Sequence, residues 1–326
     1  VLLARGDHRE ARLLPEGGSR VTALAERWRE AVEDACAEAA AGLPDPVVAA
    51  PLDDLLRRLH EALIAPWQDC LAGASRVVIL PHGALHALPF GALHDGSRAL
   101  VTALEVGVAP SVAWWEACSR REPARARGLV AACSHDGALP GAVAEGRHVA
   151  GLLGLEPLLE ASATRQAVLD AAQGAGLLHL ASHAAKRLDR PNLAHLWLAG
   201  GSLLSSRDLA ALDLRGALVT LSGCETGQGR LTGADEVLSL SRACLHAGAA
   251  TVLGTLWPLR DQAALPLVSS IYEGLRSGLT VGAALRRAQI AALQGDWPSP
   301  LDWAAFQCLG SCDTMLPPAW TQEATS

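Results

Sequence analysis

The sequence predicts an α/β fold in which a mostly parallel six-stranded sheet carries helices on both faces and follows an α-helical N-terminal segment. Two observations predict this class. From Arg76 onward, short runs of Val, Ile, Leu and Ala alternate with segments whose apolar residues recur at helical spacing. Half of the 326 residues are apolar, so the chain can bury a large core. Near-continuous apolar strands that alternate with helices indicate a parallel sheet buried on both faces.

The expected elements follow from the change between continuous apolar runs and helical periodicity. The six expected strands lie at residues 76–80, 105–109, 128–132, 177–181, 217–221 and 251–256. The helices between them are expected near residues 111–119, 142–153, 164–172, 237–247, 263–277 and 281–293.

The first 73 residues differ in pattern from the rest. Residues 20–41 and 52–71 have helical periodicity, and the Pro-containing turn at 43–46 separates them. We expect a short strand at residues 1–4 and a helical hairpin packed beside the main domain. The expected division is 1–73 for this segment, 74–316 for the main domain and 317–326 for a tail. The chain starts at Val1 without an initiator Met, which suggests a fragment of a longer protein, and helical repeats, if any, would precede it.

Composition excludes several classes of function. A formal net charge of -7 argues against nucleic acid as the main partner, because phosphate binding needs clustered Lys and Arg. The sequence has no uninterrupted apolar stretch of about 18 residues, which argues against a membrane span. Eight cysteines are scattered without a repeating spacing, and no signal peptide precedes them, so a reduced, cytoplasmic setting is expected.

His183 and Cys224 are the candidate catalytic residues. Each follows the C-terminal end of an expected buried strand, in G176-L-L-H-L-A-S-H183 and in A217-L-V-T-L-S-G-C224. Ligands bind beyond the carboxyl ends of the strands in open parallel sheets. A thiol and an imidazole from neighbouring strands are the parts of a cysteine nucleophile and its base, and they favour a cysteine peptidase. The backbone N–H groups of Cys224 and of the residue after His183, Ala184, would stabilise an oxyanion.

Other interpretations fit less well. On a strand, His179 and His183 would stand roughly 13 Å apart, too far to share one metal ion, and His179 is expected to be a core residue. The remaining cysteines are expected to be small buried hydrophobes. A nucleotide-binding protein is disfavoured because no G-x-x-x-x-G-K-[ST] loop occurs. A serine hydrolase is disfavoured because Ser222 lacks the G-x-S-x-G elbow.

Several blocks of the sequence together resemble the CHAT domain, a caspase-like peptidase domain often joined to tetratricopeptide repeats in bacteria and related to separase and the caspases. The blocks, in order, are P81-H-G-A-L-H-A-L-P-F90, A109-P-S111, L139-P-G-A142 with Glu145 and His148 after it, H179-L-A-S-H183, L221-S-G-C-E-T-G227, A247-G-A-A-T-V-L-G-T-L-W257, A283-L-R-R-A-Q289 and W303-A-A-F306. The resemblance implies a caspase-like fold, His183 as the base, Cys224 as the nucleophile and no cofactor. This sequence departs from the family at Ala184, where Gly is usual, and a positive φ there would strain Ala.

The resemblance also implies where a substrate would bind. By analogy with separase, Asp261 in L256-W-P-L-R-D261 would face a basic or polar side chain before the scissile bond. The alternative is that Asp261 caps a helix that begins near Gln262. Glu225 shapes the same pocket or holds its own loop.

The partners implied are a protein substrate and an upstream repeat domain, sensor or activator, with no direct nucleic acid and no membrane. Relatives of this kind act in bacterial antiviral defence, including beside pore-forming gasdermins, so the resemblance implies a peptidase held silent until triggered. The alternative is a catalytically silent caspase-like module that binds a regulator.

Overall fold

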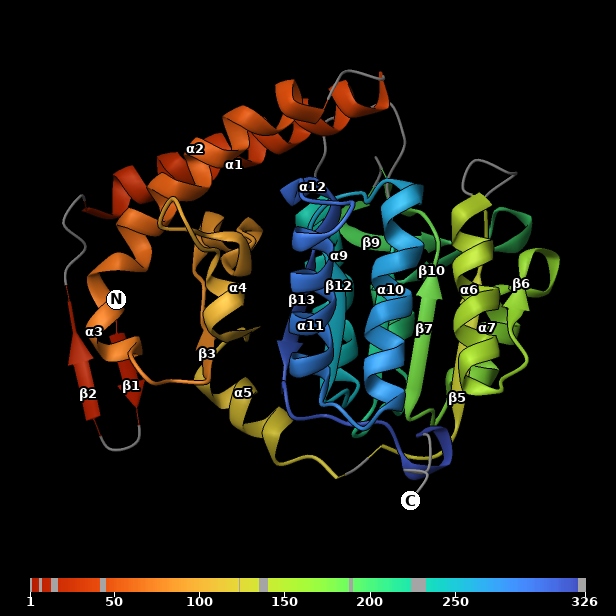
Figure 1. Ribbon diagram of the computed structural model, residues 1–326. Coiled ribbons are helices and arrows are strands. Elements are labelled where there is room, and N and C mark those ends of the chain that lie inside the picture. Colours follow the sequence, from red (N-terminus) through yellow and green to blue (C-terminus); the bar gives the residue numbers. More distant parts are fainter. Residues whose placement is uncertain are drawn as a thin grey trace.

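The central element of the fold is an eight-stranded sheet (Figure 1). The computed structural model describes residues 2–5, 8–12, 17–41, 45–122, 124–134, 140–187, 190–223 and 233–321. The strand order is β3–β4–β13–β12–β11–β7–β5–β6, and all neighbouring strands pair in parallel except β12 and β13, which pair antiparallel. The strands are β3 (Arg76–Ile79), β4 (Glu105–Val108), β5 (Gly128–Ala132), β6 (Leu158–Leu159), β7 (Leu177–Ala181), β11 (Leu218–Ser222), β12 (Thr251–Thr255) and β13 (Phe306–Gly310).

The mostly parallel α/β class is confirmed, but the expected number of six strands is wrong. The two additional strands are β6 and β13. The two-residue β6 is too short to give an apolar run. β13 contains a Gln and joins the sheet through its antiparallel pairing with β12, which local periodicity does not encode.

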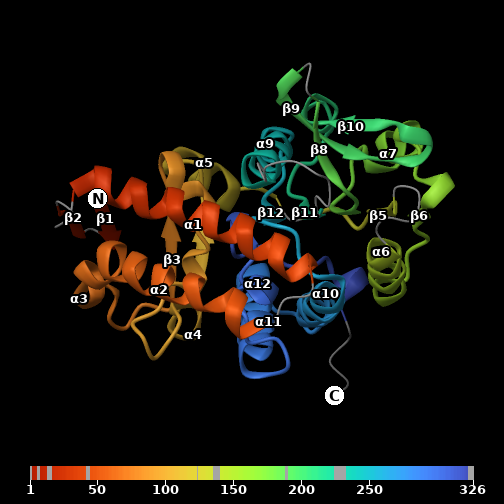
Figure 2. The same ribbon diagram turned by 90° about the horizontal axis from the view of Figure 1, so that it is seen from above.

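Helices cover both faces of the sheet, as expected (Figure 2). One face carries α6 (Pro140–Leu153), α10 (Asp261–Arg276) and α11 (Val281–Gln294), and the other carries α5 (Val112–Ser119), α7 (Arg165–Ala172) and α9 (Gly233–His246). Serine and threonine hydroxyls cap three of these helices at Ser111, Thr164 and Thr280. α9 begins four residues earlier than expected, and α10 begins at Asp261 rather than near Gln262.

The N-terminal segment consists of a strand hairpin and a helical hairpin. Strands β1 (Leu2–Arg5) and β2 (His8–Ala11) pair antiparallel, and helices α1 (Gly17–Ala40) and α2 (Asp45–Leu63) lie side by side (Figures 1 and 2). The second expected helix is divided, because Pro66 lies between α2 and the short α3 (Gln68–Leu71). The expected turn at 43–46 lies partly outside the described residues.

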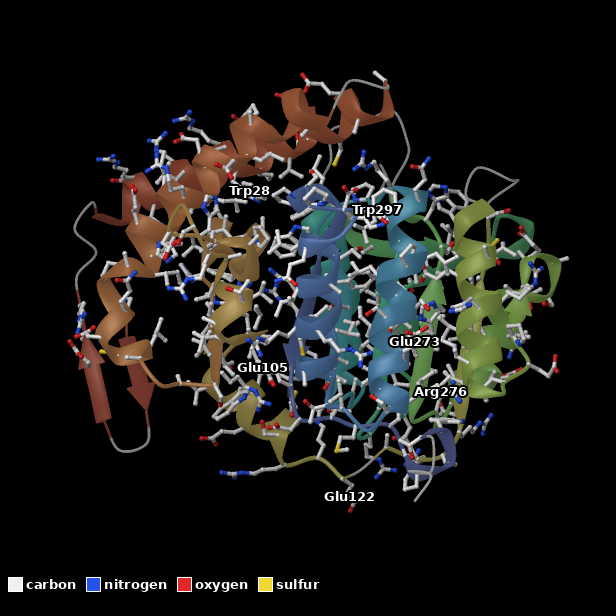
Figure 3. The ribbon with its side chains drawn as sticks, in the orientation of Figure 1. Trp28, Glu105, Glu122, Glu273, Arg276 and Trp297 are labelled. Carbon is white, nitrogen blue, oxygen red and sulfur yellow. The ribbon has the colours of Figure 1, made fainter. Side chains whose placement is uncertain are left out.

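The helical hairpin shares its core with the sheet. The indole of Trp28 in α1 is 1% exposed and packs edge-to-face on Trp257, with ring centroids 5.9 Å apart. Trp28 lies on the side of α1 that faces the main body (Figure 3). The hairpin therefore packs beside the main domain as expected, and it does so through apolar contacts with the residues that follow β12.

A small antiparallel sheet follows β7. Its order is β10–β9–β8, formed by β8 (Ala184–Arg187), β9 (Arg190–Trp197) and β10 (Leu203–Ser205), and α8 (Ser206–Ala210) comes next.

The remaining short helices are α4 (Leu100–Ala103), α12 (Pro300–Trp303) and the 3-10 helices η1 (Ala65–Trp67), η2 (Gly83–Ala87), η3 (Phe90–Ala92), η4 (Glu160–Ser162), η5 (Ala199–Gly201) and η6 (Pro318–Trp320). Among the described residues, no helix has the length and apolar character that crossing a bilayer requires.

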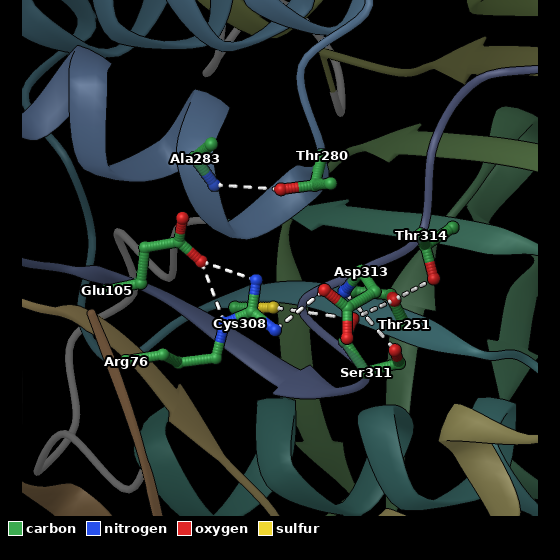
Figure 4. A network of polar contacts seen from close by, with 9 residues as sticks. All are labelled: Arg76, Glu105, Thr251, Thr280, Ala283, Cys308, Ser311, Asp313 and Thr314. Atoms are coloured by element: carbon green, nitrogen blue, oxygen red, sulfur yellow. Dashed lines mark hydrogen bonds and ion pairs between the residues drawn. The ribbon is translucent and has the colours of Figure 1, made fainter. Parts of the chain in front are cut away.

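Polar contacts fill the edge at which the parallel strands begin (Figure 4). Arg76 contacts the carboxylates of Glu105 at 2.7 Å and of Asp313 at 2.6 Å. The hydroxyls of Thr251 and Thr314 are 2.6 Å apart. This edge is held by ion pairs and hydrogen bonds, and the candidate catalytic residues belong to the opposite, carboxyl edge.

Candidate active site

The two strands that precede His183 and Cys224 are direct neighbours in the sheet. β7 and β11 pair in parallel, with Ala181 opposite Ser222 at their carboxyl ends. The pairing continues one step further, since the Ser182 N–H donates to the Ser222 carbonyl at 3.1 Å. The segments that lead to both candidates therefore leave the same edge of the sheet side by side.

His183 lies directly beyond β7, where the sequence places it. Its carbonyl accepts a hydrogen bond from the Trp197 N–H at 2.9 Å, and the Ser182 hydroxyl donates to the Trp197 carbonyl. A base beyond a strand end is expected to be exposed to substrate, but His183 is only 5% exposed. The reason is that the chain turns back into the small sheet immediately after it.

Cys224 and Glu225 lie outside the described residues, but the segment that leads to them is fixed. The hydroxyl of Thr255, at the end of β12, donates to the Gly223 carbonyl at 3.1 Å. The Ser222 hydroxyl donates to Oε2 of Glu145 at 3.1 Å. Neighbours from β12 and α6 thus hold the last two residues before Cys224.

Ala184 begins β8 and pairs with Leu196 of β9. The strand conformation is one that Ala adopts freely, so the replacement of the usual Gly causes no strain. His183 and Trp197 share a ladder hydrogen bond, so the adjacent pair of Ala184 and Leu196 is a non-hydrogen-bonded pair. The Ala184 N–H therefore points away from β9, at the outer side of an edge strand.

A buried chain of polar groups lies beneath this edge. Oε1 of Glu145 is 3.0 Å from Nε2 of His179, a close polar contact that lacks hydrogen-bond geometry. Nδ1 of His179 lies 3.0 Å from the Tyr272 hydroxyl, which lies 2.9 Å from the Thr220 hydroxyl. Burial raises the pKa of Tyr272. His179 is 0% exposed, which confirms the expected core position.

Sequence reasoning gave Tyr272 no place in the site and gave Glu145 no role beyond its part in the family resemblance. Both residues lie on helices, α6 and α10, and their partners are on strands distant in sequence. For Glu145, the available signal was a charged residue at a helix position that packs against the sheet.

Asp261 is the first residue of α10, and the helix has Arg260 as its N-cap residue. The expectation that Asp261 is the cap of a helix that begins near Gln262 is therefore wrong, because the helix begins one residue earlier and Arg260 is the N-cap residue. A carboxylate in the first turn of a helix is still favoured by the helix dipole. Arg260 donates from Nε to Oδ1 of Asp302 at 2.7 Å, and Asp302 is 1% exposed.

The seven cysteines among the described residues are free thiols. Burial raises the pKa of Cys244 and of Cys36 to about 12. The hydrogen bond between the thiols of Cys308 and Cys312 raises the pKa of Cys308 and lowers that of Cys312, but both residues are at most 2% exposed.

Within the described ranges, no group of three or more His, Cys, Asp or Glu residues could hold a metal ion.

The fold has known counterparts among solved structures. Separase of Saccharomyces cerevisiae, in its complex with securin, aligns with a TM-score of 0.50 and 15% identity over 72% of this chain and 15% of that chain. The Arg-specific cysteine proteinase gingipain R aligns with a TM-score of 0.53 and 11% identity over 83% of this chain and 70% of its own. The fold is that of the caspase-like cysteine peptidases.

The family model for the CHAT domain matches residues 53–311, and the chain belongs to this family. Tetratricopeptide repeat protein 28 of Mus musculus is 27% identical over 78% of this chain, and its Homo sapiens counterpart is 26% identical over 78%. The chain spans only 13% of the length of either protein.

Proposed function

We propose that the chain is a cysteine endopeptidase in which Cys224 is the nucleophile and His183 is its base. The observation that carries this proposal is the register of β7 and β11. Ala181 and Ser222 are opposite each other in the sheet. His183 is two residues after Ala181, and Cys224 is two residues after Ser222. Adjacent strands are about 4.8 Å apart, so equal offsets favour a thiol and an imidazole within contact distance.

The proposed reaction proceeds through a thioester. His183 takes the proton of the Cys224 thiol, and the sulfur attacks the peptide carbonyl carbon. The C–N bond then breaks, the imidazolium returns the proton to the amine, and the sulfur retains the acyl group. Water, deprotonated by the same imidazole, attacks the thioester and releases the carboxylic acid. No cofactor takes part.

The oxyanion donors in this proposal are the backbone N–H groups of Ala184 and Cys224. The outward direction of the Ala184 N–H supports its part, because the ladder with β9 does not use it. Donors of this kind stabilise the charge that develops on the carbonyl oxygen in the transition state.

Substrate recognition is assigned to Asp261 and Glu225. Asp261 lies at the start of α10, beyond the carboxyl end of β12, on the same edge of the sheet as His183. The basic residue beside it, Arg260, donates to the buried carboxylate of Asp302. We expect a basic or polar side chain before the scissile bond.

The proposed partners are a protein substrate and an upstream repeat domain that controls the site. Both curated relatives are named as tetratricopeptide repeat proteins, which supports the repeat domain. These two relatives come from mouse and human. The proposed role in bacterial defence therefore rests on the family resemblance alone.

A peptide library, with cleavage read by mass spectrometry, tests the proposal. We expect wild-type protein to cleave a subset of peptides, and Cys224→Ala and His183→Ala to lose at least about 100-fold of the rate, because general base catalysis contributes 10²–10⁴-fold. Cys70→Ala, in α3, and His94→Ala, whose ring contacts the Asp53 carbonyl of α2, are matched controls on other elements and should cleave like wild type. Cleavage by none of the five proteins would favour the silent interaction module. Equal cleavage by all five would show that Cys224 and His183 do not carry the activity.

A further inference from the structure

The buried polar chain that runs through Glu145 connects the two strands that carry the proposed dyad. Glu145 contacts His179 of β7 through one carboxylate oxygen and Ser222 of β11 through the other. On the adjacent helix, the Tyr272 hydroxyl makes the same connection between His179 and Thr220 of β11. The proposed reaction uses none of these groups.

The chain is too deeply buried to meet a substrate. Glu145 is 3% exposed, and His179 and Tyr272 are 0% exposed. A carboxylate and an imidazole are costly to remove from water, and removing one member of such a pair leaves the other without compensation. Their burial together, directly under the strand ends, calls for a role other than apolar packing.

Small residues bring Glu145 close to the sheet. At Gly146, the next residue of α6, a Cβ would lie 2.6 Å from the Cβ of Ala132 in β5. Ala142 of the same helix packs on Ala132 and on Ala181. Larger side chains at these positions would lift α6, so the sequence of the helix and the sheet fixes the depth at which Glu145 is held.

Two hydrogen bonds to the residues just before Cys224 come from different sides of the sheet strand. Glu145 holds the Ser222 side chain from the helical layer, and Thr255 holds the Gly223 carbonyl from β12. His183 is four residues beyond His179 on the same extended strand and turn. A displacement of Glu145 would therefore change the position of β11 relative to β7 at the edge where the dyad forms.

We propose that Glu145 is a positioning residue, which sets the thiol of Cys224 against the imidazole of His183 by holding Ser222 and His179 at the same time. This inference rests on the proposed function. A positioning residue of this kind changes the reactivity of the thiol without touching the substrate.

The test is the rate of Cys224 alkylation by iodoacetamide, followed by peptide mass spectrometry across pH. A free thiol has a pKa of about 8.5, and a nearby imidazole lowers it, so we expect the wild-type midpoint to lie below that value. His183→Ala should return the midpoint to about 8.5. Glu145→Gln keeps the size of the side chain but loses its charge, and it should raise the midpoint and slow alkylation at neutral pH by about tenfold, the equivalent of one pKa unit.

The matched control is Ser269→Ala. Ser269 is on α10, and its hydroxyl contacts His148 of α6 at 2.8 Å and Glu273 of α10 at 3.1 Å, so these polar contacts join helix residues to each other. Its alkylation profile should equal that of wild type. Ser222→Ala, which removes one hydroxyl, gives the second test should Glu145→Gln not fold, and it should shift the profile in the same direction. Melting temperatures measured in parallel separate loss of stability from the change in reactivity.

The outcomes separate the two proposals. An unchanged midpoint in His183→Ala overturns the dyad and this inference with it. A shifted midpoint in His183→Ala together with a wild-type profile in Glu145→Gln and Ser222→Ala overturns the positioning role and leaves the dyad standing. An equal shift in Ser269→Ala also overturns the positioning role, because any polar contact between the two helices would then have the same effect.

Discussion

At the scale of single residues, glycines decide how closely α6 approaches the sheet. Gly146→Ala would place a methyl group 2.6 Å from the Ala132 Cβ and 3.4 Å from the Leu159 Cδ2. Overpacking of this kind costs about 1–3 kcal/mol, which exceeds the helix-propensity gain of roughly 1 kcal/mol. We expect Gly146→Ala to lower the free energy of unfolding, measured by urea denaturation.

Gly151→Ala is the matched control on the same helix. A Cβ at Gly151 meets nothing within 4 Å. This variant should be neutral or more stable by up to about 1 kcal/mol, since Ala is the better helix former. Stabilisation of both variants to the same degree would contradict the close approach of α6.

The residues at the ends of strands could be predicted from the sequence, whereas their supporting residues could not. His183 and Cys224 follow apolar runs, so local pattern alone places them beyond β7 and β11. Glu145 acts through partners that are on other elements, and only the packing of α6 on the sheet brings them together. No local pattern in the sequence encodes that contact.

At the scale of elements, Trp28 is the largest of the side chains that α1 buries in the core it shares with the main domain. Trp28 is 1% exposed and packs against Trp257. Replacing a buried Trp by Ala removes its burial and leaves a cavity, at a cost of about 3–5 kcal/mol. We therefore expect Trp28→Ala to lower the midpoint of thermal unfolding of the whole chain in a single transition.

Trp115→Ala, on the surface of α5, is the control, because this indole is 38% exposed. Its midpoint should stay near that of wild type. A separate low-temperature transition in Trp28→Ala, with the main transition unchanged, would mean that the helical hairpin unfolds independently of the sheet.

The long periodic elements were predictable, and the short or tertiary-dependent ones were not. β5 and β7 have the bounds expected from their apolar runs, and α11 starts where expected. The division between α2 and α3 depends on Pro66. The helical spacing of apolar residues continues across this proline, so the pattern predicts a single helix over residues 52–71. The small sheet of β8 to β10 forms through pairing between neighbours, and polar residues interrupt the apolar runs by which the other strands are recognised.

At the scale of the whole molecule, the sheet divides the apolar core into two layers and leaves its carboxyl edge for the candidate site. One layer lies under α6, α10 and α11 and includes α1 and α2, and the other lies under α7 and α9. Polar contacts of Arg76, Glu105 and Thr251 close the opposite edge (Figure 4). The class of fold therefore predicts the location of the site, because parallel strands present their carboxyl ends together.

The central claim is that the ends of β7 and β11 bring positions 183 and 224 together. Disulfide trapping in the His183→Cys variant measures this most directly. Cys133 should be replaced by Ala in the same protein, because it follows β5, the other neighbour of β7. A disulfide needs Cα atoms about 4.4–6.8 Å apart, and adjacent strands satisfy this. Mild oxidation should link position 183 to Cys224 in most molecules, as read by peptide mass spectrometry, whereas His94→Cys should not link to Cys224. A folded His183→Cys protein that forms no such link would contradict the account.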